Sequence, residues 1–192
     1  MISLPHLLRH TLVGGFCLFL SAVSGAQAAN STEDIALGRQ QDALYRLEIH
    51  DAVGNRLDLK HHPGKLLIIN FWAYWCPHCL EEMAGFKKLQ SDLGPDCVFV
   101  VLVSSPDDWV KDQAYAIQHK IPFPRYVWTR TDTTTQAAAF LGRVQGNAVA
   151  HPLPMTAIFL PTGKLLSGHI GALDWTNPKL ENDLKDVVEL NR

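Results

Sequence analysis

Runs of apolar residues along the chain predict a central sheet. Two of them, 66–71 and 98–103, are continuous, which is typical of strands buried on both faces. Shorter apolar runs predict three further strands, at 125–128, 155–160 and 164–170. Apolar and polar residues alternate on both sides of a glycine-containing turn at 51–55, which predicts a β-hairpin near the start of the sheet.

The segments between these runs have the composition of helices. One helix of about 15 residues opens near residue 76 and ends at Gly94–Pro95, and another begins with Asn177 as its cap and Pro178 in its first turn. Helices are also predicted at 107–119 and 133–141, and a loop at 142–151. The order of strands and helices predicts one α/β domain with a mixed sheet flanked by helices.

The N-terminus has the pattern of a signal peptide over residues 1–28. Arg9 and His10 precede an apolar run at 11–23, and Ala26–Gln27–Ala28 supplies a small-x-small cleavage site. The run is shorter than the ~20 residues of a membrane span. An uncleaved N-terminal anchor stays open as the alternative. The resulting division is a signal peptide at 1–28, a helical extension at 29–44 and a folded domain at 45–192.

Composition and charge narrow the classes of function. The chain has 192 residues, of which 47% are hydrophobic, and a net charge of -2, so it has no basic field for nucleic acid. After loss of residues 1–28, three cysteines would remain: Cys76, Cys79 and Cys97. One close pair and one distant residue indicate a redox pair rather than a disulfide scaffold. Cys97 begins an apolar run and is expected to be a small buried side chain.

The close pair lies where a strand ends and a helix begins. A helix N-terminus offers unpaired N–H groups and a positive dipole end, which favour the thiolate and lower the pKa of Cys76. Cys79 lies one turn deeper on the same face and can attack a mixed disulfide formed on Cys76. Pro77 suits the first turn, and a protonated His78 would add positive charge near the thiolate.

Three other interpretations of the pair stay open. Half of a zinc site would need further ligands, and residues 29–192 have no second CxxC and no HxxxH motif. A permanent structural disulfide would leave the strand-to-helix placement unexplained. A copper chaperone could hold Cu(I) with Cys76, Cys79 and either His78 or His151. A peroxidase site, with its threonine and lone cysteine, is not matched.

The segment Asn70–Cys79, NFWAYWCPHC, resembles the active-site stretch of thioredoxin-like proteins, in particular the exported TlpA/ResA-type thiol–disulfide oxidoreductases. The stretch 51–71 is similar to that family's hairpin and first core strand, and 153–159 to the segment around its cis-proline. The closing hairpin at 161–171 also resembles the family. The resemblance implies a thioredoxin fold with an N-terminal β-hairpin extension.

The resemblance also implies roles for individual residues. Pro154 is the candidate cis-proline facing the CxxC motif, and Leu153 and Trp75 would flank the disulfide and contact substrate. Glu82 matches an acidic residue near the deeper cysteine, where it would accept a proton from Cys79; a solvated helix carboxylate is the alternative. Asn70 stands where cytosolic thioredoxins have a buried aspartate.

The direction of exchange rests on two conflicting arguments. The family resemblance implies a periplasmic reductase of exported cysteine-containing proteins, such as those of cytochrome c maturation, fed by a membrane electron-transfer partner. The Pro77–His78 dipeptide instead resembles strongly oxidising DsbA-type proteins. We expect a reducing or exchange role, with the Cys76–Cys79 disulfide as the redox group and no other cofactor or metal.

Overall fold

The computed structural model describes residues 41, 44–45, 48–60, 62, 64–129 and 153–191. The predicted signal peptide, most of the extension at 29–44, the helix at 133–141 and the loop at 142–151, with His151, lie outside these residues.

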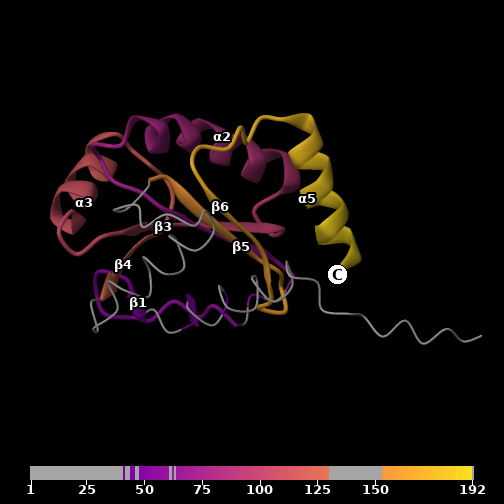
Figure 1. Cartoon of the computed structure of the whole chain (residues 1–192), viewed down its shortest axis with the longest axis horizontal. Coiled ribbons are helices and arrows are strands. Elements are labelled where there is room, and N and C mark those ends of the chain that lie inside the picture. The colour runs from indigo at the N-terminus through magenta and orange to yellow at the C-terminus, as the bar shows by residue number, and fades with distance from the viewer. Residues whose placement is uncertain are drawn as a thin grey trace, which may run out of the picture.

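Six strands form one mixed sheet in the order β1-β4-β3-β2-β5-β6 (Figure 1). Their bounds are β1 Glu48–His50, β2 Leu66–Phe71, β3 Val98–Ser104, β4 Arg125–Thr129, β5 Met155–Phe159 and β6 Leu165–Ile170. Strands β2, β3 and β4 are parallel neighbours, whereas β1, β5 and β6 pair antiparallel. The central strand β2 is buried along its whole length, as its continuous apolar sequence predicts.

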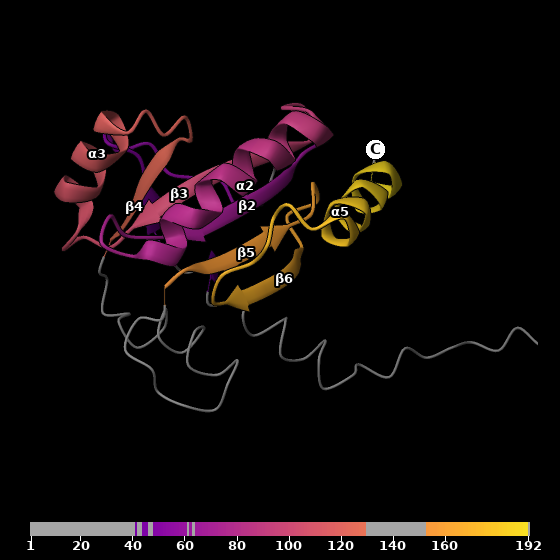
Figure 2. The ribbon, with the colours of Figure 1, turned by 90° about the horizontal axis from the view of Figure 1, so that it is seen from above.

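Three helices flank the sheet in the described part of the chain: α2 Pro77–Leu93, α3 Trp109–Gln118 and α5 Pro178–Leu190. Gly94 is the C-cap of α2, and its φ of 92° suits a residue without a side chain. The side chain of Asn177 caps α5 by accepting a hydrogen bond from the Lys179 N–H at 2.8 Å. Figure 2 shows α2 lying along the sheet over β2 and β3, with α5 beside it.

Alternate residues of the buried strands face two separate cores. On one face, Leu66 and Ile68 pack with side chains of α2 and α5. On the other face, Leu67 and Ile69 pack with Leu57 and other residues of the N-terminal segment. Burial on both faces explains why these strands lack polar alternation.

The predicted hairpin is only partly regular. The chain does turn back at 51–55, where Asp51 N–H donates to Asn55 O at 2.9 Å and Leu57 N–H to Ile49 O at 2.8 Å. Beyond the turn, however, only an isolated bridge joins His50 and Arg56. The first arm, β1, instead pairs with β4 and forms the edge of the main sheet. No helix in the described part of the chain is long and apolar enough to cross a membrane.

Candidate active site

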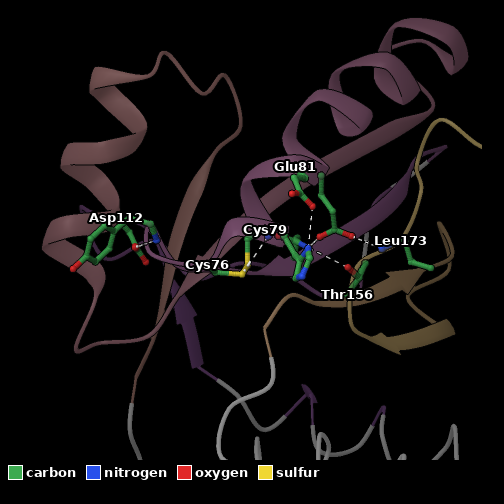
Figure 3. Close-up of a disulfide and its surroundings, with 10 residues drawn as sticks. Cys76, Cys79, Glu81, Asp112, Thr156 and Leu173 are labelled. Carbon is green, nitrogen blue, oxygen red and sulfur yellow. Dashed lines mark hydrogen bonds and ion pairs between the residues drawn. A yellow bond between two sulfur atoms is a disulfide. The ribbon is translucent and has the colours of Figure 1, made fainter.

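Cys76 and Cys79 form a disulfide at the N-terminus of α2 (Figure 3). Their sulfurs are 2.03 Å apart and their Cα atoms 5.3 Å apart. The disulfide therefore lies at the strand-to-helix junction that the sequence predicts, next to the unpaired N–H groups of the first helical turn.

Cys76 is the N-cap residue of α2, with extended backbone angles of φ -93° and ψ 105°. Its Sγ accepts a hydrogen bond from the Cys79 N–H at 3.2 Å. Pro77 stands in the first turn, where its missing N–H leaves no bond unmade. In the reduced state the same N–H and the positive helix end would stabilise a thiolate on Cys76.

The two sulfur-bearing residues differ in access to solvent. Cys76 is 4% exposed and Cys79 is fully buried at 0%. Of the two, only Cys76 has exposed surface that a protein thiol or disulfide could contact. Trp75, immediately before it, is 53% exposed and presents an aromatic surface at the rim of the site.

Leu153 and Pro154 lie at the same end of the sheet. Met155 of β5 pairs with Phe71, the last residue of β2, so the segment before β5 lies beside the start of the loop that leads to Cys76. The Leu153–Pro154 peptide bond is cis, as the family resemblance implies. Pro154 is buried, and its carbonyl accepts a hydrogen bond from the Gly171 N–H at 2.9 Å.

Glu82 is buried one turn beyond Cys79 on the same face of α2. Its Oε1 accepts hydrogen bonds from the Leu173 N–H and from Nε1 of Trp175, both at 2.9 Å. Its Oε2 accepts one from Nδ2 of Asn70 at 3.0 Å. The same Nδ2 of Asn70 also donates a hydrogen bond to Oγ1 of Thr156 on β5 at 3.1 Å.

Burial raises the pKa of Glu82 above its usual value. The hydrogen bonds from Leu173, Trp175 and Asn70 and the nearby His169 oppose that rise without cancelling it. Glu82 is therefore not the solvated carboxylate that the sequence left open. A buried carboxylate with a raised pKa is suited to take up a proton from a neighbouring thiol.

The His78 side chain is paired with Glu81. Its Nδ1 lies 2.9 Å from Oε2 of Glu81, and both side chains are exposed. A protonated His78 would therefore be paired with a carboxylate, which reduces the positive charge it offers to a Cys76 thiolate. Cys97 is buried and in no disulfide, as expected.

The hydrogen-bond partners around Glu82 have no signal in the linear sequence. Asn70 donates both to Glu82 and to Thr156, its partner on β5, and Trp175 donates to Glu82 from the segment before α5. Asp112 of α3 is a buried carboxyl that contacts the loop before Cys76. Among the described residues, no group of three or more potential ligands is placed to hold a metal ion.

A mixed sheet with a buried central strand that leads into a CxxC disulfide at a helix N-terminus defines the class of thioredoxin-fold thiol–disulfide oxidoreductases. The chain belongs to the AhpC/TSA family, whose family model matches residues 41–167, more than half of the sequence.

Relatives and solved structures agree with this class. The chain is 23% identical to the thiol-disulfide oxidoreductase ResA of Halalkalibacterium halodurans over 145 residues, which is 76% of each chain. It is similar in fold to dsbF of MTB, with a TM-score of 0.51, 20% identity and coverage of 78% of this chain and 98% of the other. A pneumococcal exposed lipoprotein thioredoxin, Etrx1 of Streptococcus pneumoniae, gives a TM-score of 0.50 at 21% identity, covering 72% and 97%.

Proposed function

We propose that this oxidoreductase works outside the cytoplasm and reduces disulfides in exported proteins through Cys76 and Cys79. The observation that carries the proposal is the asymmetry of the pair: Cys76 caps the helix and keeps 4% of its surface exposed, whereas Cys79 is fully buried. This asymmetry suits a nucleophile and a resolving thiol. The signal-peptide pattern of residues 1–28 supports export.

The reaction begins with the reduced pair. The Cys76 thiolate attacks one sulfur of a client disulfide, so that the client S–S bond breaks and a mixed disulfide forms. The departing client sulfur leaves as a thiolate and takes a proton from water. Trp75 and Leu153 would contact the client chain beside the cis-Pro154 peptide.

Resolution needs a second thiolate. Glu82 accepts the proton of the Cys79 thiol, and the Cys79 thiolate attacks Sγ of Cys76. The Cys76–Cys79 disulfide forms, the mixed disulfide breaks, and the second client thiolate is released. The client gains two electrons and the pair loses two. A dithiol-bearing membrane partner would return them by the reverse exchange.

The reducing direction has two supports. The resemblance to TlpA/ResA-type proteins implies a reductase, and relatives named ResA match the chain over most of its length. In addition, the His78–Glu81 ion pair weakens the case for a strong oxidant, because that case needs a free positive charge beside the Cys76 thiolate. Cytochrome c maturation is a client pathway that the resemblance suggests.

The reduction potential of the pair tests the direction. Purified protein is equilibrated in dithiothreitol and glutathione buffers, and tryptophan fluorescence reports the redox state. We expect a potential of about −250 mV or lower, near that of thioredoxin. A value near about −120 mV would overturn the reducing direction in favour of an oxidant. Cys97→Ala should leave the titration unchanged and Cys76→Ala should abolish it.

A further inference from the structure

Asp112 is a buried acidic residue that the exchange reaction described above does not use. It lies on α3, its side chain is fully buried, and it points toward the loop before α2 (Figure 3). Its Oδ1 accepts a hydrogen bond from the Tyr74 N–H at 2.7 Å. A bond of this length between a peptide N–H and a carboxylate is charge-assisted. The contact joins α3 to a residue two positions before Cys76.

The peptide unit that Asp112 holds has a second anchor. The N–H of Tyr74 and the carbonyl of Ala73 belong to the same peptide plane. The Ala73 carbonyl accepts a hydrogen bond from the Cys76 N–H at 3.1 Å. One rigid plane therefore lies between the Asp112 carboxylate and the backbone of the nucleophilic cysteine.

This arrangement couples the two hydrogen bonds. A carboxylate that accepts from one end of a peptide polarises it and strengthens the acceptor at its other end. If the carboxylate is removed, the plane can rotate and the Cys76 N–H loses its fixed partner. The backbone angles that place Sγ of Cys76 over the helix N-terminus would then be less restricted.

Other contacts of α3 hold side chains of this loop but not the peptide. The Tyr115 ring lies 6.4 Å from the Trp72 ring and 6.5 Å from the Tyr74 ring. Nζ of Lys111 lies 5.8 Å from the centre of the Tyr74 ring. These contacts keep the loop near α3 when Asp112 is changed, so that a variant tests the orientation of the peptide.

The carboxyl is ionised at neutral pH. Burial raises the pKa of Asp112 to about 6, and the Asp108 carboxylate one turn earlier adds to the rise. The Ser104 hydroxyl at the end of β3 and the Tyr74 N–H oppose it. A charged acceptor is therefore present at the loop under the conditions of a neutral assay.

We propose that Asp112 is a positioning residue of the redox centre: its carboxylate fixes the Ala73–Tyr74 peptide, and that peptide fixes Cys76 at the N-terminus of α2. Asp112 touches neither the sulfurs nor a client, and it acts through the loop. The inference rests on Cys76 being the nucleophile of the proposed function. It does not depend on the direction of exchange.

The test measures the alkylation rate of Cys76 in the reduced protein, with iodoacetamide at neutral pH and mass spectrometry of the Cys76 peptide. Asp112→Ala removes the acceptor and should slow alkylation about tenfold, the effect of losing one charge-assisted hydrogen bond. Asp112→Asn keeps an oxygen acceptor for the Tyr74 N–H and should restore the rate to within about threefold of the wild type.

A purely electrostatic role predicts the opposite sign. Loss of a negative charge near the site would stabilise the thiolate, so both variants would react faster than the wild type. That outcome, or equal rates in Asp112→Ala and the wild type, would overturn the proposal. Asp108→Asn removes a neighbouring charge but leaves the Tyr74 contact, and it should react like the wild type.

Loss of stability is controlled separately. Leu57→Ala opens a cavity in the core on the other face of the sheet, away from the cluster that holds Cys76 and Cys79. This variant should lower the melting temperature without slowing the alkylation of Cys76. If it slows alkylation as much as Asp112→Ala does, the effect comes from lost stability and the proposal is overturned. A different result would contradict the proposed function alone: wild-type Cys76 is alkylated at a normal rate, but the reduced protein exchanges with no client disulfide. The comparison between the Asp112 variants would then still hold.

Discussion

Glu81 and Glu82 are the same residue type at adjacent positions of α2, yet their surroundings differ. The Glu81 side chain is 70% exposed and pairs with His78. Glu82 is 4% exposed and is held by donors from three other parts of the fold. Burial raises the pKa of Glu82, so of these two carboxylates it is the one prepared to take up a proton.

Replacing Glu82 by Gln should slow the second step of exchange. The amide cannot accept the Cys79 proton, so the mixed disulfide on Cys76 should persist about 100-fold longer, the usual effect of removing a general base. Single-turnover quenching with a disulfide-bonded peptide measures that lifetime. The wild-type rate of resolution should also fall as pH drops through the raised pKa of Glu82, and the variant should lack this component.

Glu81→Gln is the matched control for Glu82→Gln, one residue away on the same helix. It removes an exposed carboxylate and should change the lifetime of the mixed disulfide by less than about threefold, because exposed ion pairs contribute little. Equal lifetimes in the two variants would refute the assignment of Glu82 as proton acceptor.

At the scale of single residues, the sequence identifies those site residues that are neighbours along the chain. Cys76, Cys79 and Pro77 are neighbours along the chain, and their helix-end position follows from the pattern around them. The partners of Glu82 cannot be found this way. Trp175 lies 93 positions away, and its contact depends on how the segment before α5 crosses α2.

At the scale of elements, α2 approaches the segment before α5 through a glycine. A Cβ added at Gly85 would lie 2.7 Å from Cβ of Trp175, closer than two carbon atoms can pack. The Trp175 side chain is buried against Phe86, with ring centres 4.6 Å apart. Its Nε1 also donates to Glu82. The absence of a side chain at Gly85 therefore permits the contact that positions the Glu82 carboxylate.

Gly85→Ala should destabilise the protein by about 1–3 kcal/mol, the range of overpacked core sites. In an open helix the same change would stabilise by about 1 kcal/mol, so the sign of the effect reports the contact. Urea unfolding followed by circular dichroism measures it. Lys87→Ala, on the exposed side of α2, should shift stability by less than about 0.5 kcal/mol. A stabilised Gly85→Ala protein would show that Trp175 moves freely.

Most elements could be predicted from the sequence because their signals are local. The apolar run of β2 and the caps of α5 lie where the pattern places them. The pairing of β1 could not be predicted. Alternation indicates a strand, but it does not say which neighbour the strand joins, and β1 pairs with β4 across nearly 80 positions.

At the scale of the whole molecule, two acidic side chains are buried: Asp112 on α3, which contacts the loop before Cys76, and Glu82 on α2, one turn beyond Cys79. Burial raises the pKa of both, that of Asp112 from 3.8 to about 6. The folded protein therefore binds protons more tightly at these sites than the unfolded chain does. Between the unfolded and folded pKa values, stability must fall as pH rises.

This linkage predicts a pH profile of stability that differs from ordinary acid denaturation. The contribution of Asp112 is fully present below about pH 4 and is lost as pH rises through about 6. Its size is at most about 3 kcal/mol, from a shift of about two pKa units. The free energy of unfolding in urea, measured from pH 4 to 7, should therefore decrease between about pH 4 and 6. Asp112→Asn should flatten the decrease, and the double variant with Glu82→Gln should flatten it further.

A wild-type profile that rises over this range, or one that Asp112→Asn leaves unchanged, would mean that water or a rearranged loop solvates the Asp112 carboxyl. The Tyr74 contact would then not exist in solution as it does in the structure.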